Sequence, residues 1–257
     1  MKESNNLTTN TYWDRCYKGE KNTGQRIDIF SEMPSSELNV YFRKNLPKDK
    51  KFKFLEIGCA PGRWMHYFYS NFNYCVEGIE YTPNGAKLTR SNLSTLGVDN
   101  VIYEQDLFNN SLNKNSYDLV FSAGFIEHFN DPSLVIEKHL GLLKKGGYLV
   151  LEVPNFRGFN GFFQKITDKS LLEIHNLNIM NLDFFKNIAE KHDLEIVDIS
   201  YVGKINFGLF LGNKFLIYIG QVIQFFINKL YFILGKRIFI SDNKFFSPYI
   251  VAVYVKK

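Results

Sequence analysis

Residues 54–63 decide the fold, and they read Phe54-Leu55-Glu56-Ile57-Gly58-Cys59-Ala60-Pro61-Gly62-Arg63. The apolar run before Gly58 is typical of a buried parallel strand. The two glycines that follow allow the backbone to approach a ligand closely. A helix is predicted from Trp64, so the free N–H groups at its start are expected to face a bound cofactor.

The spacing of small residues distinguishes two classes of cofactor site. A dinucleotide frame that starts at Gly58 requires a small residue at position 63, where the chain has Arg63. The pattern Glu56-x-Gly58-x-Ala60-x-Gly62 instead resembles the E/D-x-G-x-G-x-G motif of class I S-adenosylmethionine (SAM)-dependent methyltransferases, with Ala60 at the middle glycine. The resemblance implies SAM as cofactor and S-adenosylhomocysteine as product. It also implies that the binding loop contains Glu56, Gly58, Ala60, Gly62 and Arg63.

Acidic residues follow the next two predicted strands. Glu80 lies 22 residues after Gly58, the interval at which α/β nucleotide sites place a carboxylate on the ribose hydroxyls. Asp106 and Leu107 follow the third strand, and the resemblance implies that they contact the adenine amino group and ring. Further cofactor contacts are expected at Tyr81, Ser122 and Gly124.

The fourth predicted strand leads into Glu127-His128. This segment resembles the D-x-V-x-x-x-x-x-x-E-H piece of small-molecule methyltransferases of the ubiquinone-biosynthesis type, and it lacks the Asn/Asp-Pro-Pro-Tyr motif of base and protein-amide methyltransferases. His128 is the leading candidate base, since a neutral imidazole takes a hydroxyl proton near pH 7. His175 is the second candidate, and Glu127 would orient the acceptor or a metal ion. Local backbone binding is the alternative for both histidines, and no metal site is assigned.

Two further segments are expected on the acceptor side. The resemblance implies that Tyr12 and Trp13 belong to a lid over the cofactor, while an arm held loosely by its aromatic side chains is the alternative. Residues 155–180 are predicted to form an insertion over the same rim, with Asn155 at its start as a substrate or lid contact.

Predicted strands alternate with helices over most of the chain, which indicates βαβ units. We therefore expect an α/β fold with a Rossmann-like, seven-stranded, mostly parallel sheet, helices on both faces, an antiparallel edge hairpin and helical insertions. A glycine cap at Gly146-Gly147 is expected to end one helix. The predicted division is an arm or lid at 1–30, a SAM-binding domain at 31–203 and 247–257, an acceptor-side insertion at 155–180 and an apolar basic helical insertion at 204–246.

The segment 215–234 is nearly all apolar, but Gln221, Gln224, Asn228 and Lys229 share one sector of a helical wheel. Four polar residues argue against a membrane-spanning helix and favour an amphipathic one. Packing against the sheet domain or a dimer partner is the first expectation for residues 207–240. Peripheral membrane contact, assisted by nearby lysines, is the alternative.

Charge and cysteine content limit the functional classes. The formal net charge is +5, and residues 201–257 hold eight Lys or Arg residues against one acid, Asp242. The three cysteines are scattered without a Cys-x-x-Cys pair, which excludes an iron–sulfur radical enzyme and suits reduced thiols. The N-terminus has no apolar signal segment. We expect a cytoplasmic protein, with peripheral binding to a membrane as the alternative.

The acceptor is expected to be a small molecule, because the core domain lacks the stripe of basic and aromatic residues that is typical of nucleic-acid binding. A composition rich in Lys, Asn, Ile and Phe, with an apolar tail, resembles methyltransferases of bacterial surface-polysaccharide or capsule gene clusters. This implies methyl transfer to oxygen, with nitrogen as second choice, on an anionic metabolite such as a sugar or a phosphoramidate. The alternatives are a membrane-associated quinone or lipid O-methyltransferase and a non-catalytic SAM-fold partner protein.

Overall fold

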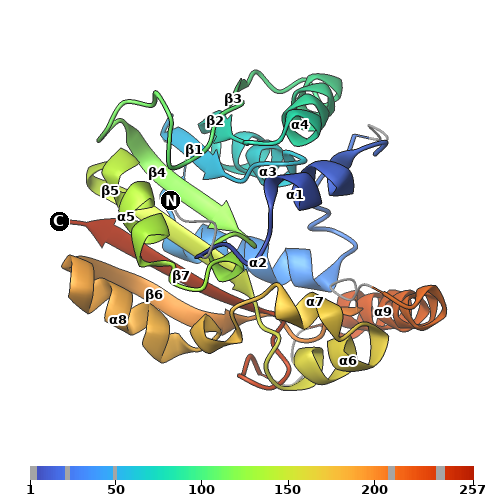
Figure 1. Ribbon diagram of the computed structural model, residues 1–257. Coiled ribbons are helices and arrows are strands. Elements are labelled where there is room, and N and C mark those ends of the chain that lie inside the picture. The colour runs from blue at the N-terminus through green and yellow to red at the C-terminus, as the bar shows by residue number, and fades with distance from the viewer. Residues whose placement is uncertain (1–4, 21–23, 49–50, 208–211, 236–240) are drawn as a thin grey trace.

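A seven-stranded sheet is the centre of the computed structural model (Figure 1), which describes residues 5–20, 24–48, 51–207, 212–235 and 241–257. Its strands are β1 (Lys53–Ile57), β2 (Cys75–Ile79), β3 (Val101–Tyr103), β4 (Tyr117–Ala123), β5 (Leu143–Pro154), β6 (Leu194–Val202) and β7 (Tyr249–Lys256). They are ordered β3-β2-β1-β4-β5-β7-β6. The first five strands of that order run parallel, and β7 pairs antiparallel with both β5 and β6. The predicted sheet and its antiparallel edge hairpin are confirmed.

Helices cover both faces of the sheet (Figure 1). They are α1 (Asn10–Tyr17), α2 (Met33–Asn45), α3 (Arg63–Phe72), α4 (Pro83–Thr95), α5 (Ser133–Leu142), α6 (Phe159–Thr167), α7 (Ser170–Glu173), α8 (Leu182–His192) and α9 (Lys214–Leu234), with 3₁₀ turns η2 (Ile126–His128) and η3 (Leu177–Ile179). Adjacent residues of β1 serve different cores, because Phe54 packs with α2 and α3 whereas Leu55 packs with α5 and α8. Burial on both faces explains the unbroken apolar run in this strand.

One helix end differs from the sequence prediction. No glycine caps α5: the helix ends at Leu142, and Gly146 lies inside β5. The Lys256 ammonium from β7 donates to the carbonyl groups of Leu140 and Leu143, at 2.8 and 2.7 Å. A lysine from a distant strand therefore bonds to the terminal carbonyl groups of the helix. In a glycine cap, backbone N–H groups just after the helix usually do so.

The N-terminal segment is an ordered helix rather than a loose arm. Asp14 of α1 accepts hydrogen bonds from the backbone N–H and the side-chain amide of Asn84 in α4, at 3.0 and 2.7 Å. Before the helix, the Leu7 N–H donates to the carbonyl oxygen of His128, at 2.8 Å. Helix α1 is thus joined to both α4 and η2.

Helix α9 lies at the edge of the molecule (Figure 1), and most of its apolar residues do not pack against the sheet domain. Two polar residues face the protein instead: Gln224 accepts from the Phe207 N–H at 2.9 Å, and Asn228 accepts from the Met33 N–H at 3.2 Å. Gln221 and Lys229 are exposed. Its apolar side faces outward, where Phe215, Phe226 and Ile233 are 70%, 63% and 77% exposed. Within the described part of the chain, α9 alone has the length and composition of a membrane-crossing helix.

Candidate active site

A cavity of about 680 Å³ opens at the carboxyl ends of the central parallel strands, beneath α1. This is where the strand order reverses between β1 and β4, the usual place for a ligand in an open α/β sheet. Seven residues predicted to contact the cofactor line it, namely Gly58, Ala60, Glu80, Tyr81, Asp106, Leu107 and Gly124.

The loop after β1 approaches its neighbours closely at Gly58. This residue has φ +71°, and a Cβ atom added to it would lie 2.7 Å from the Phe125 ring. The Gly58 N–H donates to the Ile79 carbonyl oxygen at 2.9 Å, which holds the loop against the end of β2. Any side chain here would displace Phe125 from the cavity wall.

The acid after β2 is buried and already oriented. Glu80 is 4% exposed, and its Oε1 accepts from the Thr82 N–H at 2.8 Å and from the Thr82 hydroxyl at 2.6 Å. Burial raises the pKa of Glu80, and these hydrogen bonds oppose the rise. Further along the rim, Asp106 is exposed, and its Oδ1 accepts from the Phe108 N–H at 2.9 Å.

Three predicted loop contacts lie outside the cavity lining. Glu56 is buried below the loop, where it accepts a hydrogen bond from the backbone of Met65 in α3. Gly62 has φ +87° and packs against Leu93 of α4. Arg63 begins α3 and is likewise absent from the lining. These residues shape the junction of loop and helix rather than face a ligand.

Two other predicted contacts are also corrected by the structure. The Ser122 hydroxyl lies 3.1 Å from Nε2 of His139 on α5, inside the core. The Asn155 side chain is fully buried and donates to the carbonyl groups of Lys244 and Ser247, at 3.1 and 2.8 Å. Ser122 thus secures α5, and Asn155 secures the segment before β7.

Of the two predicted lid residues, only Trp13 lines the cavity. Its indole N–H donates to the Thr8 hydroxyl at 2.9 Å, and its ring meets the His128 ring edge-on at 5.0 Å between centroids. Tyr12 points away, into a separate hollow beside Cys16. Tyr17 lines the main cavity instead. It follows Trp13 by four residues in α1, so helical spacing was the signal that would have identified it.

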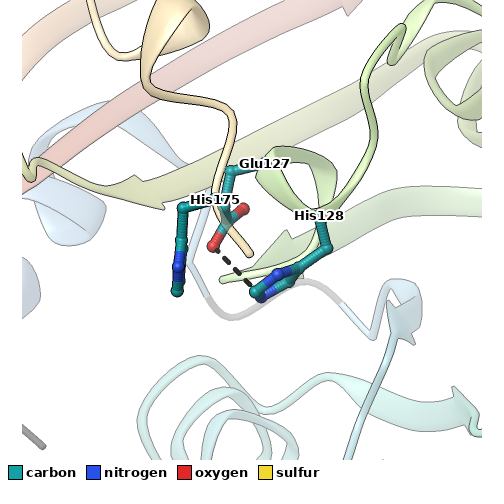
Figure 2. Close-up of side chains that lie close together, drawn as sticks. All are labelled: Glu127, His128 and His175. Atoms are coloured by element: carbon teal, nitrogen blue, oxygen red, sulfur yellow. Dashed lines mark ion pairs between the residues drawn. The ribbon is translucent and has the colours of Figure 1, made fainter. Parts of the chain in front are cut away.

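Glu127, His128 and His175 come together from two segments at the acceptor end of the cavity (Figure 2). The Glu127 and His128 side chains approach to 3.8 Å between Oε1 and Nε2, and the two imidazole centroids lie 4.6 Å apart. His128 lines the cavity, whereas His175 packs behind it, against Phe156. The backbone N–H of Asn176 donates to the Glu127 carbonyl oxygen at 2.7 Å and so joins the two segments.

Burial favours the uncharged form of every member of this cluster. It raises the pKa of Glu127 to about 8. The pKa of His128 falls to about 3, mainly through burial and partly through the nearby His175. Burial also lowers the pKa of His175. The approach of Glu127 to His128 therefore joins two neutral groups at pH 7 and is not an ion pair.

The cavity lining suits a positively charged nucleoside cofactor. Among the described residues that form it, Glu80 and Asp106 are acidic and none is Lys or Arg. A sulfonium cofactor such as SAM would meet no like charge there. Gly58 and Ala60 would lie under it, and Glu80 and Asp106 would accept its hydrogen bonds.

Comparisons with known proteins agree with this site. A family profile described as a methyltransferase domain matches residues 48–198. A tRNA U34 carboxymethyltransferase of Desulfotalea psychrophila is 31% identical over 138 residues, which cover 51% of this chain and 42% of that protein. The chain thus spans less than half the length of this relative.

Two solved structures share the fold over nearly the whole chain. A geranyl diphosphate C-methyltransferase from Streptomyces coelicolor, solved with Mg²⁺, geranyl diphosphate and S-adenosylhomocysteine, has TM-score 0.61 and 11% identity, with 96% of this chain and 98% of the other covered. A possible histamine N-methyltransferase from Thermotoga maritima has TM-score 0.57 and 16% identity, with 96% of both chains covered.

Proposed function

The chain belongs to the class I SAM-dependent methyltransferase family, and from this premise we propose that it methylates an oxygen atom of a small metabolite held beside His128. SAM is the methyl donor. Membership of an enzyme family sets aside the alternative of a non-catalytic partner. The observation that carries the proposal is the position of His128 in the lining of the same cavity as Glu80 and Asp106, beside the Glu127 carboxyl group.

Bound SAM supplies an electrophilic methyl group, and the protein must align an acceptor with it. Nδ1 of His128 lies 2.8 Å from the Ile174 carbonyl oxygen. Because a carbonyl oxygen can only accept a hydrogen bond, Nδ1 must carry the proton. Nε2 then has a free lone pair for an acceptor hydroxyl. An imidazole with a pKa of about 3 is a weak proton acceptor, so we assign His128 to positioning the oxygen first of all.

The size and lining of the cavity support a small acceptor over a macromolecule. Trp13 and Tyr17 of α1 cover it, and its volume of about 680 Å³ lies within the range of sites for single drug-sized ligands. Cofactor and acceptor together would fill such a space. A sugar or phosphoramidate of a capsule precursor is our proposed acceptor class on sequence resemblance, with nitrogen methylation as second choice. The basic residues of segment 201–257 do not support an anionic acceptor, because none of the described residues that line the cavity is Lys or Arg.

The test begins with calorimetric titration of the purified chain with SAM and S-adenosylhomocysteine, with NAD as the control. Micromolar binding of the first two alone is expected. Formation of S-adenosylhomocysteine is then measured with sugar phosphates, phosphoramidates, quinols, amines and tRNA as acceptors, and mass spectrometry locates the methyl group. A methylated carbon, amine or tRNA product would overturn oxygen transfer to a small metabolite.

A second candidate function rests on α9. Its exposed apolar residues span roughly 200° of the helix at 3.6 residues per turn. The helix has no acidic residue, and both Lys214 and Lys229 are exposed. Pairing with a second copy would bring these cations together without an acid to offset them. We therefore propose that α9 lies on an anionic membrane surface, at its cytoplasmic side, and that the acceptor is then a quinone or lipid.

Vesicle sedimentation tests the membrane proposal. Vesicles of phosphatidylcholine with phosphatidylglycerol are expected to retain the protein, and vesicles of phosphatidylcholine alone to retain less. Replacing Phe225, Phe226 and Phe232 by Ser should abolish retention, whereas Phe30→Ser, at an exposed phenylalanine outside α9, should leave it intact. Retention unchanged by the α9 substitutions, or a dimer that they dissociate, would contradict membrane binding.

A further inference from the structure

We propose that Glu127, His128 and His175 form a binding site for a divalent transition-metal ion, of which Zn²⁺ is the best match. Each side chain offers one ligand atom, and these atoms lie within 4.8 Å of one another (Figure 2). The set consists of two imidazoles and one carboxylate. The site depends only on these three side chains and would bind a metal ion whether or not the acceptor atom is oxygen.

Both imidazoles are held in the tautomer that a metal ligand needs. Nδ1 of His128 lies 2.8 Å from the Ile174 carbonyl oxygen, and Nδ1 of His175 lies 2.7 Å from the Leu171 carbonyl oxygen. Each Nδ1 must donate, which leaves the lone pair of each Nε2 free. Hydrogen bonding of the remote ring nitrogen to a carbonyl is the arrangement that orients metal-binding histidines.

The Glu127 carboxyl group needs a partner that the ligand-free protein does not give it. The residue is fully buried, and within the described structure neither Oε1 nor Oε2 has a hydrogen-bond partner. Burying a polar group without a hydrogen bond is energetically unfavourable. A cation between Glu127 and the two Nε2 atoms would remove that cost.

The donor set selects among metal ions. Imidazole nitrogen suits Zn²⁺ and its transition-metal neighbours, whereas Mg²⁺ and Ca²⁺ prefer oxygen ligands throughout. Tetrahedral Zn²⁺ with bonds of about 2.0–2.1 Å has ligand atoms roughly 3.3 Å apart, so the widest separation in the cluster, up to 4.8 Å, must contract by as much as about 1.5 Å. Rotation of side chains at the wall of a cavity allows such a movement.

The position of the site gives the ion access to an acceptor. His128 and Gly124 both line the cavity, and a Cβ atom on Gly124 would lie 3.6 Å from Oε1 of Glu127. Three protein ligands leave a coordination position open. An acceptor hydroxyl bound to the ion would lose its proton more readily. The ion would thus promote the deprotonation for which His128 alone is a weak base. The cavity would also gain the positive charge that its described lining does not provide.

The test measures metal binding by the full chain without SAM. Protein treated with a chelator is titrated calorimetrically with ZnCl₂ and, separately, with MgCl₂. One equivalent of Zn²⁺ should bind at micromolar concentration or below, with at least tenfold weaker binding of Mg²⁺. Glu127→Gln and His175→Gln should each weaken Zn²⁺ binding at least tenfold, and circular dichroism checks that both variants fold.

Two control variants separate this site from other ligands. His192→Ala removes a histidine at the end of α8, and Cys16→Ser removes an exposed thiol near α1. Both should bind Zn²⁺ like the parent chain. Co²⁺ bound in place of Zn²⁺ should give a visible spectrum without thiolate charge transfer. Absence of stoichiometric Zn²⁺ binding, or binding that survives the cluster substitutions, would overturn the proposal and leave the SAM titration unaffected.

Discussion

The buried carboxyl groups at the two ends of the cavity differ in their hydrogen bonding. At the cofactor end, Glu80 already accepts two hydrogen bonds from Thr82. At the acceptor end, Glu127 is equally buried but has none within the described structure. The cofactor end is therefore complete before its ligand arrives, and the acceptor end is completed by what binds there. A preorganised end suits a cofactor that is used in every turnover.

Removal of the oriented acid should have the largest effect. Glu80→Ala is expected to raise the dissociation constant of SAM by about 10-fold to 150-fold, or about 1.5–3 kcal/mol, the scale of a hydrogen bond to a charged group. Calorimetry measures the constant. Glu104→Ala, which breaks only an exposed ion pair with Arg90, is the control and should bind SAM normally. Unchanged affinity in the Glu80 variant would remove Glu80 from the cofactor site.

A substitution at the acceptor end should separate turnover from cofactor binding. His128→Ala is expected to lower kcat by about 10-fold to 100-fold, because the acceptor loses a positioning group. The dissociation constant of SAM should change by less than about threefold. Steady-state kinetics and calorimetry measure the two quantities. Equal losses in both would show that the ends of the cavity are not independent.

The unpartnered acid should make the metal-free protein less stable as the pH rises. The folded-state pKa of Glu127, about 8, lies above its ordinary value of 4.5, so the folded protein holds this proton more tightly. The contribution to stability is fully present below about pH 4.5 and is lost as the pH approaches 8. Glu127→Gln should therefore be more stable than the parent chain at pH 8, by a few kcal/mol, and similar to it at pH 4.5.

Chemical denaturation at the two pH values, with a chelator present, measures this difference. Glu104→Gln is the matched control, since that side chain is exposed. A parent chain that is as stable as the glutamine variant at pH 8 would mean that Glu127 has a partner after all.

The smallest effect is expected from substitution of Trp13, whose ring contacts residues at both ends of the cavity. Its ring stacks with Tyr17 at 6.4 Å and meets His128 at 5.0 Å. Trp13→Phe keeps an aromatic ring but removes the hydrogen bond to Thr8, worth about 0.5–1.5 kcal/mol. The KM for the acceptor should rise about threefold to tenfold while SAM binding stays near normal. A larger effect on SAM than on the acceptor would assign Trp13 to the cofactor end.

Local spacing predicted correctly that three residues of the expected cofactor site would gather at one cavity. Gly58, Glu80 and Asp106 each follow a strand, and the ends of parallel strands meet at one edge of the sheet, so chain order alone brings them together. Side-chain direction was harder to predict. Ser122 lies one residue before Ala123, which lines the cavity, and strand alternation turns it into the core. Tyr12 and Trp13 are adjacent on a helix and therefore point in different directions.

Helix α9 shows another limit of sequence patterns. A helical wheel separates its polar sector from its apolar sector but does not tell which one faces the protein. Here the backbone N–H groups of Phe207 and Met33 take Gln224 and Asn228 as partners, so part of the polar sector faces the protein while most of the apolar sector faces outward. The cluster with His175 was equally hidden, because the approach of His175 to Glu127 depends on how two loops distant in sequence are joined.

The connections of α1 have a consequence for the catalytic cycle. This helix covers the cavity while Asp14 holds it to α4 and Leu7 holds the preceding segment to η2. Exchange of spent cofactor past α1 would require these hydrogen bonds to open and close in each cycle. Enzymes built in this way are commonly limited by product departure, and they accumulate in the product-bound state as product builds up. A coupled enzyme that removes S-adenosylhomocysteine would then raise the steady-state rate without any change in the chemistry.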